Sequence, residues 1–346
     1  MHMRKPDRPA PAVWFPAIRA GSGADVFTER LVDGLLARGL RAEITWLPHR
    51  AEYMPWSVPS PPAPPWANIV HVNSWLHPRF IPTRLPMVAS MLHSVHDPAL
   101  MPYKTLPQRL YHRLWVKPVE RAILRQADRV IAISRYTAAR THDVFGIDDI
   151  DVIPIGIDLN GPFQPIPSPV MRHRPFRLLY IGNWSARKGA DLLAPIMRNL
   201  GEEYELWLRT GLRDREFASL PPNMKQIPHC EGDEALAQLY HQCDALLFPS
   251  RLEGFGMVAL EAQACGLPVI ATNGSALPEV VEDGVTGLLC TFGAIEEFAH
   301  AARRLAADGE LFLALRNAAG KHAAKHLDLP RMIDRYIAVY ESILAR

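Results

Sequence analysis

Short apolar runs alternate with longer amphipathic stretches along the whole chain. Each run is four to seven residues long, which is typical of strands buried on both faces, and the stretches between them repeat apolar residues at helical spacing. The runs predict strands at 12–18, 41–47, 68–72, 86–92, 129–133 and 151–155, and again at 176–182, 204–210, 224–228, 245–249, 268–272 and 287–290. The stretches predict helices at 24–38, 105–127, 189–200, 233–243, 256–265 and 296–307. This alternation predicts an α/β fold built on parallel sheets.

Two proline clusters divide this pattern. The first, PWSVPSPPAPP at 55–65, predicts an extended loop, because proline removes a backbone donor and excludes helices and central strands. The second, PFQPIPSPVMRHRP at 162–175, lies near the midpoint and predicts a linker between two domains, residues 1–161 and 176–328. Two consecutive doubly wound domains imply a ligand in the cleft between them, beyond the carboxyl ends of the strands.

The composition indicates a globular protein of about two domains and excludes several other classes. Of the 346 residues, 48% are hydrophobic and 21% are charged, which argues against disorder and coiled coil. No apolar run approaches the ~18–20 residues of a membrane-spanning helix, and the first residues lack the apolar core of a secretion signal, so we expect a cytosolic protein. The cysteines are far apart, which argues against zinc and disulfides and predicts reduced, mostly buried thiols at Cys230, Cys243, Cys265 and Cys290.

The net charge of +2 combines a basic first half with an acidic second half. Residues 1–165 hold 19 Lys and Arg against 14 Asp and Glu, a net charge of +5, which leaves −3 for the remainder. Part of this excess is a basic stripe that recurs every fourth residue on one helix face: Arg109, Arg113, Lys117, Arg121 and Arg125. The stripe is either a solvated face or a contact for anionic lipid headgroups or a phosphate-bearing acceptor. An acidic second half does not fit nucleic-acid binding.

The same helix is expected to kink at Pro118, because proline lacks the N–H of a helical hydrogen bond. Its large apolar residues are expected to lie in the core rather than to anchor the protein in a membrane: Leu110, Leu114, Trp115 and Ile123.

The segment at 244–261 carries the clearest chemistry. An apolar strand runs into Pro249 and Ser250, then into the loop RLEGFG, and then into a helix that contains Glu261. Glycines at 254 and 256 allow a ligand to approach the backbone closely, and the amides that open a helix bind anions, phosphate above all. Two carboxylates, Glu253 and Glu261, flank these amides and would repel phosphate, so sugar hydroxyls are their natural partners. The segment predicts a ligand with phosphates in its middle and hydroxyls at both ends.

This segment closely resembles the retaining GT-B glycosyltransferases of family four, the group 1 glycosyl transferases, whose signature is two glutamates separated by seven residues within EGFG-x-x-x-x-E. Further blocks along most of the chain resemble the same family in the right order: 20–23, 92–97, 128–134, 152–158 and 181–189. The resemblance implies a GT-B fold, with two Rossmann-like, doubly wound parallel-sheet domains facing a central cleft. It also implies that residues 329–346 form a helix that returns to the first domain.

Roles for individual residues follow from this resemblance. Glu261 should bind the nucleotide ribose, and Glu253 should bind hydroxyls of the transferred sugar. Lys188 should neutralise the diphosphate, and amides of the glycine-rich loop should contact the sugar and the distal phosphate: Gly254, Phe255, Gly256, Met257 and Val258. The loop after the first strand of this same donor domain adds Gly182 and Asn183 to the expected donor site.

Asn183 departs from the family, because most relatives have an arginine at this position. Arg187, which adjoins Lys188, is the candidate to replace that arginine, although its side chain would approach from a different angle. The departure leaves undecided which residue supplies the second of the two positive charges that usually neutralise the diphosphate.

In the first domain the resemblance implies a role for the turn at 92–97, where His96 should lie near the donor sugar and His93 is a weaker candidate. Gly21, Ser22 and Gly23 are similar to the family's glycine loop and should contact phosphate or acceptor, or else form a tight turn.

The expected reaction is transfer of a hexose from a UDP- or GDP-sugar to a glycan or lipid-linked acceptor, with retention, in surface polysaccharide biosynthesis. The enzyme would be cytoplasmic and could associate with the inner face of a membrane. No cofactor or metal is expected, because no Asp-x-Asp cluster follows an apolar strand and the acidic run at 148–151 is typical of a solvated loop.

Several other functions remain open from the sequence. A nucleotide-sugar epimerase or a sugar phosphorylase could use the same architecture, and Asn183 makes a degenerate sugar-binding module conceivable. A nicotinamide dehydrogenase is disfavoured, because Val26 occupies the third glycine position of the dinucleotide fingerprint.

Overall fold

The chain divides into two units, which are described separately. The structure, a computed structural model, describes residues 9–165, 172–211, 220–228 and 232–345. The N-terminal unit comprises residues 1–155 and 329–346, and the C-terminal unit comprises residues 156–328. Part of the expected linker, residues 166–171, lies outside the described residues, as does Cys230.

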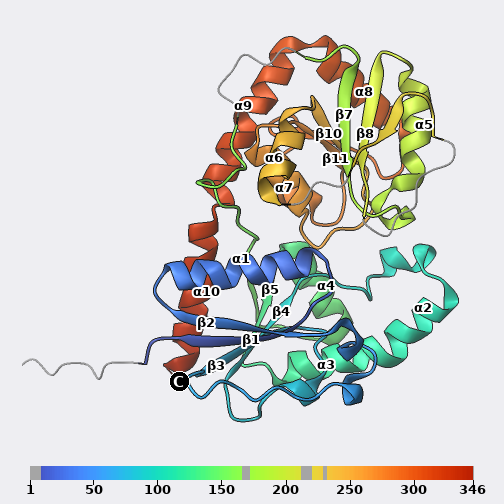
Figure 1. Cartoon of the computed structure of the whole chain (residues 1–346). Helices are drawn as coiled ribbons and strands as arrows, with labels where there is room; N and C mark the ends of the chain where they lie inside the picture. The colour runs from blue at the N-terminus through green and yellow to red at the C-terminus, as the bar shows by residue number, and fades with distance from the viewer. Residues whose placement is uncertain (1–8, 166–171, 212–219, 229–231, 346) are drawn as a thin grey trace, which may run out of the picture. The chain divides into compact units, whose positions relative to one another are not determined.

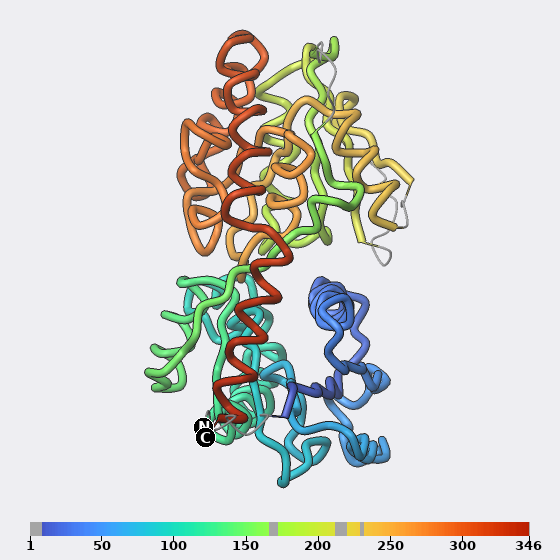
Figure 2. Tube along the Cα trace, turned by 90° about the vertical axis from the view of Figure 1, so that its left-hand side faces the viewer, coloured from blue at the N-terminus to red at the C-terminus, as the bar shows by residue number. Residues whose placement is uncertain are grey.

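The N-terminal unit is built on a six-stranded parallel sheet (Figure 1). The trace in Figure 2 shows the red C-terminal end of the chain lying within this unit. The order is β2-β1-β3-β4-β5-β6, and the strands are β1 (Ala12–Ile18), β2 (Arg41–Leu47), β3 (Ile69–Asn73), β4 (Met87–Met91), β5 (Arg129–Ala132) and β6 (Ile150–Val152). Central strands such as β4 are buried at every position, because helices cover both faces of a parallel sheet. The α-helices of this unit are α1 (Gly23–Ala37), α2 (Leu106–Tyr111), α3 (Lys117–Gln126), α4 (Arg135–Phe145) and α10 (Leu329–Leu344).

Helix α10 brings the end of the chain back to the N-terminal unit, where it packs against α1. The helices approach so closely that a Cβ atom at Gly34 would lie 2.4 Å from Cδ1 of Ile333. A buried polar contact also fixes α10 to the sheet: both ring nitrogens of His71 lie 2.7 Å from a hydroxyl, one of Tyr340 and one of Ser90. Burial lowers the pKa of His71 to about 3, so the ring is neutral.

The C-terminal unit has a second six-stranded parallel sheet with the order β12-β11-β10-β7-β8-β9 (Figure 1). Its strands are β7 (Phe176–Ile181), β8 (Tyr204–Arg209), β9 (Met224–Gln226), β10 (Ala245–Phe248), β11 (Val269–Thr272) and β12 (Gly287–Cys290). Its helices are α5 (Ala190–Leu200), α6 (Asp233–His241), α7 (Met257–Ala264), α8 (Ile295–Ala307) and α9 (Gly309–His326). The core lies between the sheet and its helices and includes Tyr180, Ile196, Leu247 and Phe298.

All twelve expected strands are present, with shifted ends in some cases. Two local expectations were wrong, those for the Pro-rich loop and for the acidic run. The Pro-rich loop begins with a 3-10 turn at Pro55–Ser57, because proline is favourable at the start of a helical turn. The acidic run at 148–151 is not all loop, since Ile150 and Asp151 belong to edge strand β6, where Asp151 lies 3.7 Å from Arg129. The helix at 105–127 departs from α geometry before Pro118, in a π-helical stretch at His112–Val116 that joins α2 to α3.

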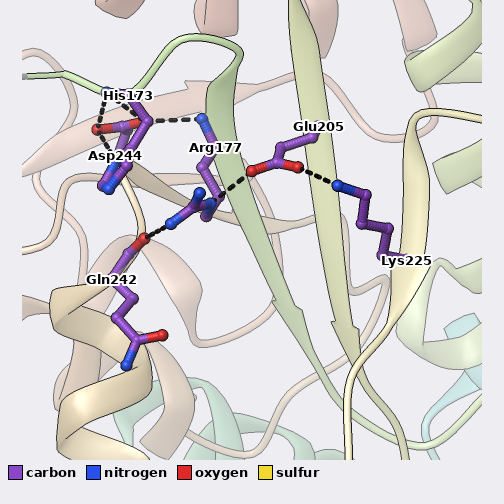
Figure 3. Close-up of polar contacts among 6 residues, drawn as sticks. All are labelled: His173, Arg177, Glu205, Lys225, Gln242 and Asp244. Atoms are coloured by element: carbon purple, nitrogen blue, oxygen red, sulfur yellow. Dashed lines mark hydrogen bonds and ion pairs between the residues drawn. The ribbon is translucent and has the colours of Figure 1, made fainter.

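A network of charged side chains joins the amino ends of β7, β8 and β9 (Figure 3). Arg177 Nε donates to Glu205 Oε1 at 2.6 Å, and Lys225 Nζ donates to Glu205 Oε2 at 2.8 Å. Asp244, which directly precedes β10, accepts hydrogen bonds from the backbone and ring of His173 and from the backbone of Arg177. These contacts fix the strand register at the edge of the sheet opposite to the expected ligand site.

Candidate functional site

The strand order of the C-terminal sheet identifies where a ligand can bind. The chain runs outward from β7 to β8 and β9, and in the other direction from β10 to β11 and β12, so the order reverses between β7 and β10. Loops leave the carboxyl ends of strands on either side of such a switch point in opposite directions and open a crevice there. The two loops that do so here are residues 182–189 and 249–256, which contain the expected donor site.

Backbone contacts hold these two loops together. Gly189 has a φ of +72° and lies so close to the second loop that a Cβ atom would be 2.1 Å from the carbonyl oxygen of Pro249. The backbone N–H of Arg251 donates to the carbonyl of Arg187 at 2.9 Å, and the Arg187 guanidinium donates to the carbonyl of Leu252 at 3.1 Å. Only glycine at position 189 allows the two backbones to approach so closely. Together with the hydrogen bonds, this contact makes the two loops one rigid element.

Lys188 and Glu253 form a buried ion pair at this junction. Lys188 Nζ lies 2.7 Å from Glu253 Oε1, and the two side chains are 16% and 10% exposed. Burial alone would raise the pKa of Glu253, but the charges of Lys188 and Arg187 hold it below its usual range. Burial lowers the pKa of Lys188, and the charge of Glu253 opposes that shift. The expected catalytic lysine and glutamate are therefore brought together, with Arg187 as a second cation nearby.

Helix α7 begins directly after this pair. Its N-cap is Gly256, with a φ of +112°, and no side chain accepts a hydrogen bond at this cap. A helix start without a side-chain cap suits an anion. The phosphate-binding roles expected of Gly254, Phe255, Gly256, Met257 and Val258 stay predictions.

Ser275 supports the same loop from the turn after β11. Its φ is +51°, an unusual left-handed conformation for a residue with a side chain, and its Oγ accepts the Glu253 backbone N–H at 3.1 Å. Strained backbone of this kind persists where the surrounding structure fixes it, and here it fixes the position of Glu253.

Glu261 lies one turn into α7, where it is buried at 6% exposure. The hydroxyl of Tyr240 donates to its Oε2 at 3.1 Å, and burial together with the Glu261 charge raises the pKa of Tyr240 well above the usual value. Glu261 is thus held by a neutral tyrosine on α6.

Asn183 is exposed in the first loop, where its backbone carbonyl accepts a hydrogen bond from the Tyr180 hydroxyl at 3.1 Å. Gly182 precedes it and lies beside Tyr180 and Lys188. Positive charge at this position comes from Lys188 and Arg187 rather than from residue 183.

The N-terminal sheet has its own switch point, between β1 and β3. Ser22 caps α1 after β1, and the Asp25 carboxylate accepts the backbone N–H groups of Ala20 and Gly21. Gly21 has a φ of +65° and Gly23 is the first residue of α1. The glycine loop is therefore a tight turn around a carboxylate, and that negative charge disfavours phosphate at the same amides.

His96 lies in the loop after β4 and pairs with buried Glu120 of α3, with Nε2 2.8 Å from Oε2. Ser74, which follows β3, donates to the other oxygen of Glu120 at 3.1 Å. His93 lies in the same loop, closer to the end of β4. A buried carboxylate thus fixes the orientation of the His96 ring at the carboxyl edge of the N-terminal sheet.

The basic stripe lies on α2, α3 and the π-helical stretch between them. Arg109, Arg113, Arg121 and Arg125 are exposed and Lys117 is partly buried. The expectation that Leu110 and Leu114 lie in the core was wrong, because they are 50% and 69% exposed, whereas Ile123 is buried. The helix places its core-facing positions on another side, since Val116, Val119 and Leu124 are also buried.

Four site residues were missed from the sequence: Asp25, Glu120, Tyr240 and Ser275. Asp25 carried a readable signal, since an acidic residue in the first helical turn is a common capping feature. The other three owe their place to contacts between segments far apart in the sequence.

Two family models match the chain. "Glycosyl transferases group 1" matches residues 167–326, and "Glycosyltransferase Family 4" matches residues 66–160. The first region contains Lys188, Glu253 and Glu261, and the second contains His96. The matches support a GT-B glycosyltransferase of group 1.

Several relatives of this chain carry the name D-inositol 3-phosphate glycosyltransferase. The protein from Actinosynnema mirum is 32% identical over 248 residues, which are 64% of this chain and 59% of the relative. The protein from Catenulispora acidiphila is 29% identical over 315 residues, 82% of this chain and 74% of the relative. The chain spans about three fifths of the first relatives' length.

Solved glycosyltransferase structures share the fold at low identity. Sucrose-phosphate synthase from Thermosynechococcus elongatus has a TM-score of 0.78 at 20% identity, covering 97% of this chain and 100% of that one. Anabaena HepE in complex with UDP and glucose has a TM-score of 0.72 at 17% identity, covering 96% and 100%. WaaG, described as a glycosyltransferase involved in lipopolysaccharide biosynthesis, has a TM-score of 0.71 at 18% identity, covering 95% and 99%. The two parallel sheets of this chain therefore form a GT-B fold.

The described residues contain neither a membrane-spanning helix nor a metal-binding cluster. None of the described helices is long and apolar enough to cross a membrane. Among the same residues, no three or more His, Cys, Asp or Glu side chains are grouped so that they could hold a metal ion. The described cysteines, Cys243, Cys265 and Cys290, are free and buried.

Proposed function

We propose that the protein is a retaining glycosyltransferase that transfers a hexose from a UDP- or GDP-sugar to a glycan or lipid-linked acceptor. The observation that carries the proposal is the buried pair of Lys188 and Glu253 beside the uncapped start of α7, at the switch point of the C-terminal sheet. The C-terminal unit holds the donor and the N-terminal unit holds the acceptor. The proposed setting is surface polysaccharide biosynthesis in the cytoplasm, at the inner face of a membrane when the acceptor is lipid-linked.

The chemistry of the reaction requires this kind of site. Cleavage of the bond between sugar and phosphate leaves negative charge on the diphosphate. Cations and helix-end amides that are already in place stabilise that charge without a cost for reorganising the site. Lys188 and the α7 amides supply both, and Arg187 supplies the second cation that Asn183 cannot. Glu253 then accepts hydrogen bonds from sugar hydroxyls, and Glu261 accepts them from the ribose.

The relatives support the donor class and the setting. The A. mirum relative is named as a glycosyltransferase that acts on D-inositol 3-phosphate, and HepE, which shares the fold, binds UDP and glucose. WaaG, with the same fold, is involved in lipopolysaccharide biosynthesis. Retention is proposed from the family resemblance, with front-face attack in which the leaving phosphate takes the acceptor's proton, so no protein nucleophile is assigned.

We propose that the reaction needs no metal, because a lysine and an arginine take the place of a cation beside the phosphates. Activity should be unchanged when EDTA is added to the enzyme. Loss of activity in EDTA, restored by Mg²⁺ or Mn²⁺, would overturn this part of the proposal and leave sugar transfer intact.

A thermal-shift screen of UDP-, GDP- and ADP-sugars tests the donor. A donor at 100 times its dissociation constant adds ~2.7 kcal/mol to the free energy of unfolding. Release of nucleoside diphosphate is then measured with an acceptor panel, and the anomeric configuration of the product is read by NMR. Release that requires acceptor supports transfer over epimerisation, and an inverted product would refute retention alone.

Matched variants test the site. Glu253→Gln and Lys188→Met should each lower transfer by roughly 10²–10³-fold, the typical effect of removing one group that stabilises the transition state. Lys225→Met is the control, because it breaks an ion pair of similar length, with Glu205, at the opposite edge of the same sheet. Near wild-type turnover in both site variants would refute the assignment of Lys188 and Glu253 to the transfer reaction.

The alternative function is a degenerate sugar-binding module, which the exposed Asn183 favours. It predicts a thermal shift with a nucleotide sugar and no diphosphate release with any acceptor of the panel. An Asn183→Arg variant that gains turnover would support that alternative for the natural protein.

A further inference from the structure

Three leucines form an exposed row on the helix that begins at Leu106. Leu106, Leu110 and Leu114 are 68%, 50% and 69% exposed, although they are four residues apart and belong to one face. Exposure of single leucines is common, but a row of three on one helix is an apolar surface that a water-soluble protein rarely leaves uncovered.

A neighbouring loop extends this surface. The indole N–H of Trp115 donates to the carbonyl of Glu52 at 2.9 Å, and the rings of Trp115 and Trp56 meet edge-on at 5.9 Å. These contacts hold the loop against the helix and leave Trp56 64% exposed, with Tyr53 and Met54 exposed beside it. We call this the apolar face, and it consists of Tyr53, Met54, Trp56, Leu106, Leu110 and Leu114.

Positive charges border the leucine row. Arg109, Arg113 and Lys117 each follow one of the three leucines by three positions, so they adjoin the row on the helix surface. Within the part of the chain that the structure describes, Arg113, Lys117, Arg121 and Arg125 have no ion-pair partner. The helix's one carboxylate, Glu120, is buried against His96.

We infer that the apolar face docks into the headgroup region of an anionic lipid bilayer, with the basic stripe on lipid phosphates. Leucine and tryptophan gain by leaving water at the interface, and each nearby Lys or Arg gains further from the negative surface. A second copy of the chain fits poorly, because two such faces would bring unpaired arginines together. This docking concerns the N-terminal unit and does not depend on the proposed sugar transfer.

Flotation with lipid vesicles tests the docking. Full-length protein is mixed with phosphatidylcholine vesicles that contain or lack phosphatidylglycerol, at low and high salt. The wild type should float with the anionic vesicles, and high salt should weaken this binding. The variant Leu106→Asn/Leu110→Asn/Leu114→Asn should bind anionic vesicles at least about tenfold more weakly, because its apolar contribution is lost.

The charges are tested separately. The variant Arg113→Gln/Lys117→Gln/Arg121→Gln should lose roughly a hundredfold in binding to anionic vesicles. Its residual binding should depend less on salt than that of the wild type, because only Arg109 and Arg125 of the stripe remain. Brominated lipids should quench tryptophan emission, and Trp56→Phe should remove part of that quenching.

Two controls separate the effect of the leucine row from other causes of weak binding. Leu36→Asn/Leu313→Asn removes two leucines that are each 49% exposed on other helices, and it should bind like the wild type. The donor-induced thermal shift should be unchanged in the leucine variant, which separates failure of docking from failure of the donor site.

Two results would overturn the inference. The first is a wild type that does not float with anionic vesicles, or a leucine variant that floats equally well. The second is a wild-type dimer in solution that the leucine variant abolishes, because a second copy would then be the occupant of the face.

Discussion

The Lys188–Glu253 pair allows stability and catalysis to be separated in one experiment. In Lys188→Met the Glu253 carboxylate stays buried beside Arg187 without its 2.7 Å partner. Removing one partner of a buried ion pair typically costs about 3–5 kcal/mol, because an uncompensated charge remains. We therefore expect Lys188→Met to destabilise the C-terminal unit by about that amount at neutral pH, with Arg187 offsetting part of the cost.

The loss should depend on pH with a defined sign. In the wild type the pKa of Glu253 is lowered, so its contribution is present above the unfolded pKa and is lost as the pH falls through the folded value. Without Lys188, the burial that raises this pKa is opposed mainly by Arg187 and by the Ser250 hydrogen bond, so we expect the pKa to rise above the unfolded value. The variant is then favoured at acidic pH and loses stability as the pH rises, so its deficit should grow by up to about 1.4 kcal/mol per pH unit between the two folded pKa values.

Urea unfolding at several pH values, followed by hydrogen exchange of peptides from the C-terminal unit, measures this effect. The double variant Lys188→Met/Glu253→Gln should recover most of the stability, because both groups are then neutral, but transfer should remain roughly 10²–10³-fold lower. A double variant no more stable than Lys188→Met at neutral pH, or a single variant with the same pH profile as the wild type, would refute this account of the pair.

Three further predictions concern other positions. Gly189→Ala should destabilise the C-terminal unit by several kcal/mol in thermal unfolding, because its Cβ would lie 2.1 Å from the Pro249 carbonyl oxygen. Because the pKa of His71 is about 3, the free energy of unfolding of the N-terminal unit should fall by about 2 kcal/mol as the pH falls from 7 to 5, since only the unfolded chain binds a proton at His71 in this range. Hydrogen exchange of α10 should show this pH dependence in the wild type and not in His71→Gln. Ser275→Ala should lower transfer more than it lowers stability, and Ser275→Gly should be the more stable of the two because glycine accepts a φ of +51°.

The strands could be predicted well because parallel strands are buried on both faces and read as continuous apolar runs. Helices α4 and α9 were missed because their sequences are less regularly amphipathic, with Thr137 and Thr141 buried in α4 and Gly320 inside α9. Their ends carried usable signals. Ser134 caps α4 and Gly146 ends it with a φ of +69°, as capping rules would have indicated.

The site could be predicted residue by residue only where a local motif carried it. Lys188 and Glu253 were both identified, but their contact depends on the close approach of Gly189 to Pro249, sixty residues further along the chain. The prediction that Leu110 and Leu114 lie in the core failed for a different reason. Periodicity identifies an apolar face on a helix, but the helix at 106–126 has a buried face and an exposed one, and only packing distinguishes them.

Strand direction decides which edge of the C-terminal sheet is functional. The amino edge has a cavity of about 720 Å³, which is lined in part by His173 and Phe176. The charged network of Figure 3 lies at the same edge. There, however, Asp244 and Glu205 already accept several hydrogen bonds each from groups that fix the strands. At the carboxyl edge, Lys188 faces one carboxylate and α7 starts without a side-chain cap, so binding capacity for an anion remains. The cavity at the amino edge is therefore the weaker candidate, because a site needs polar groups that the fold has not already used.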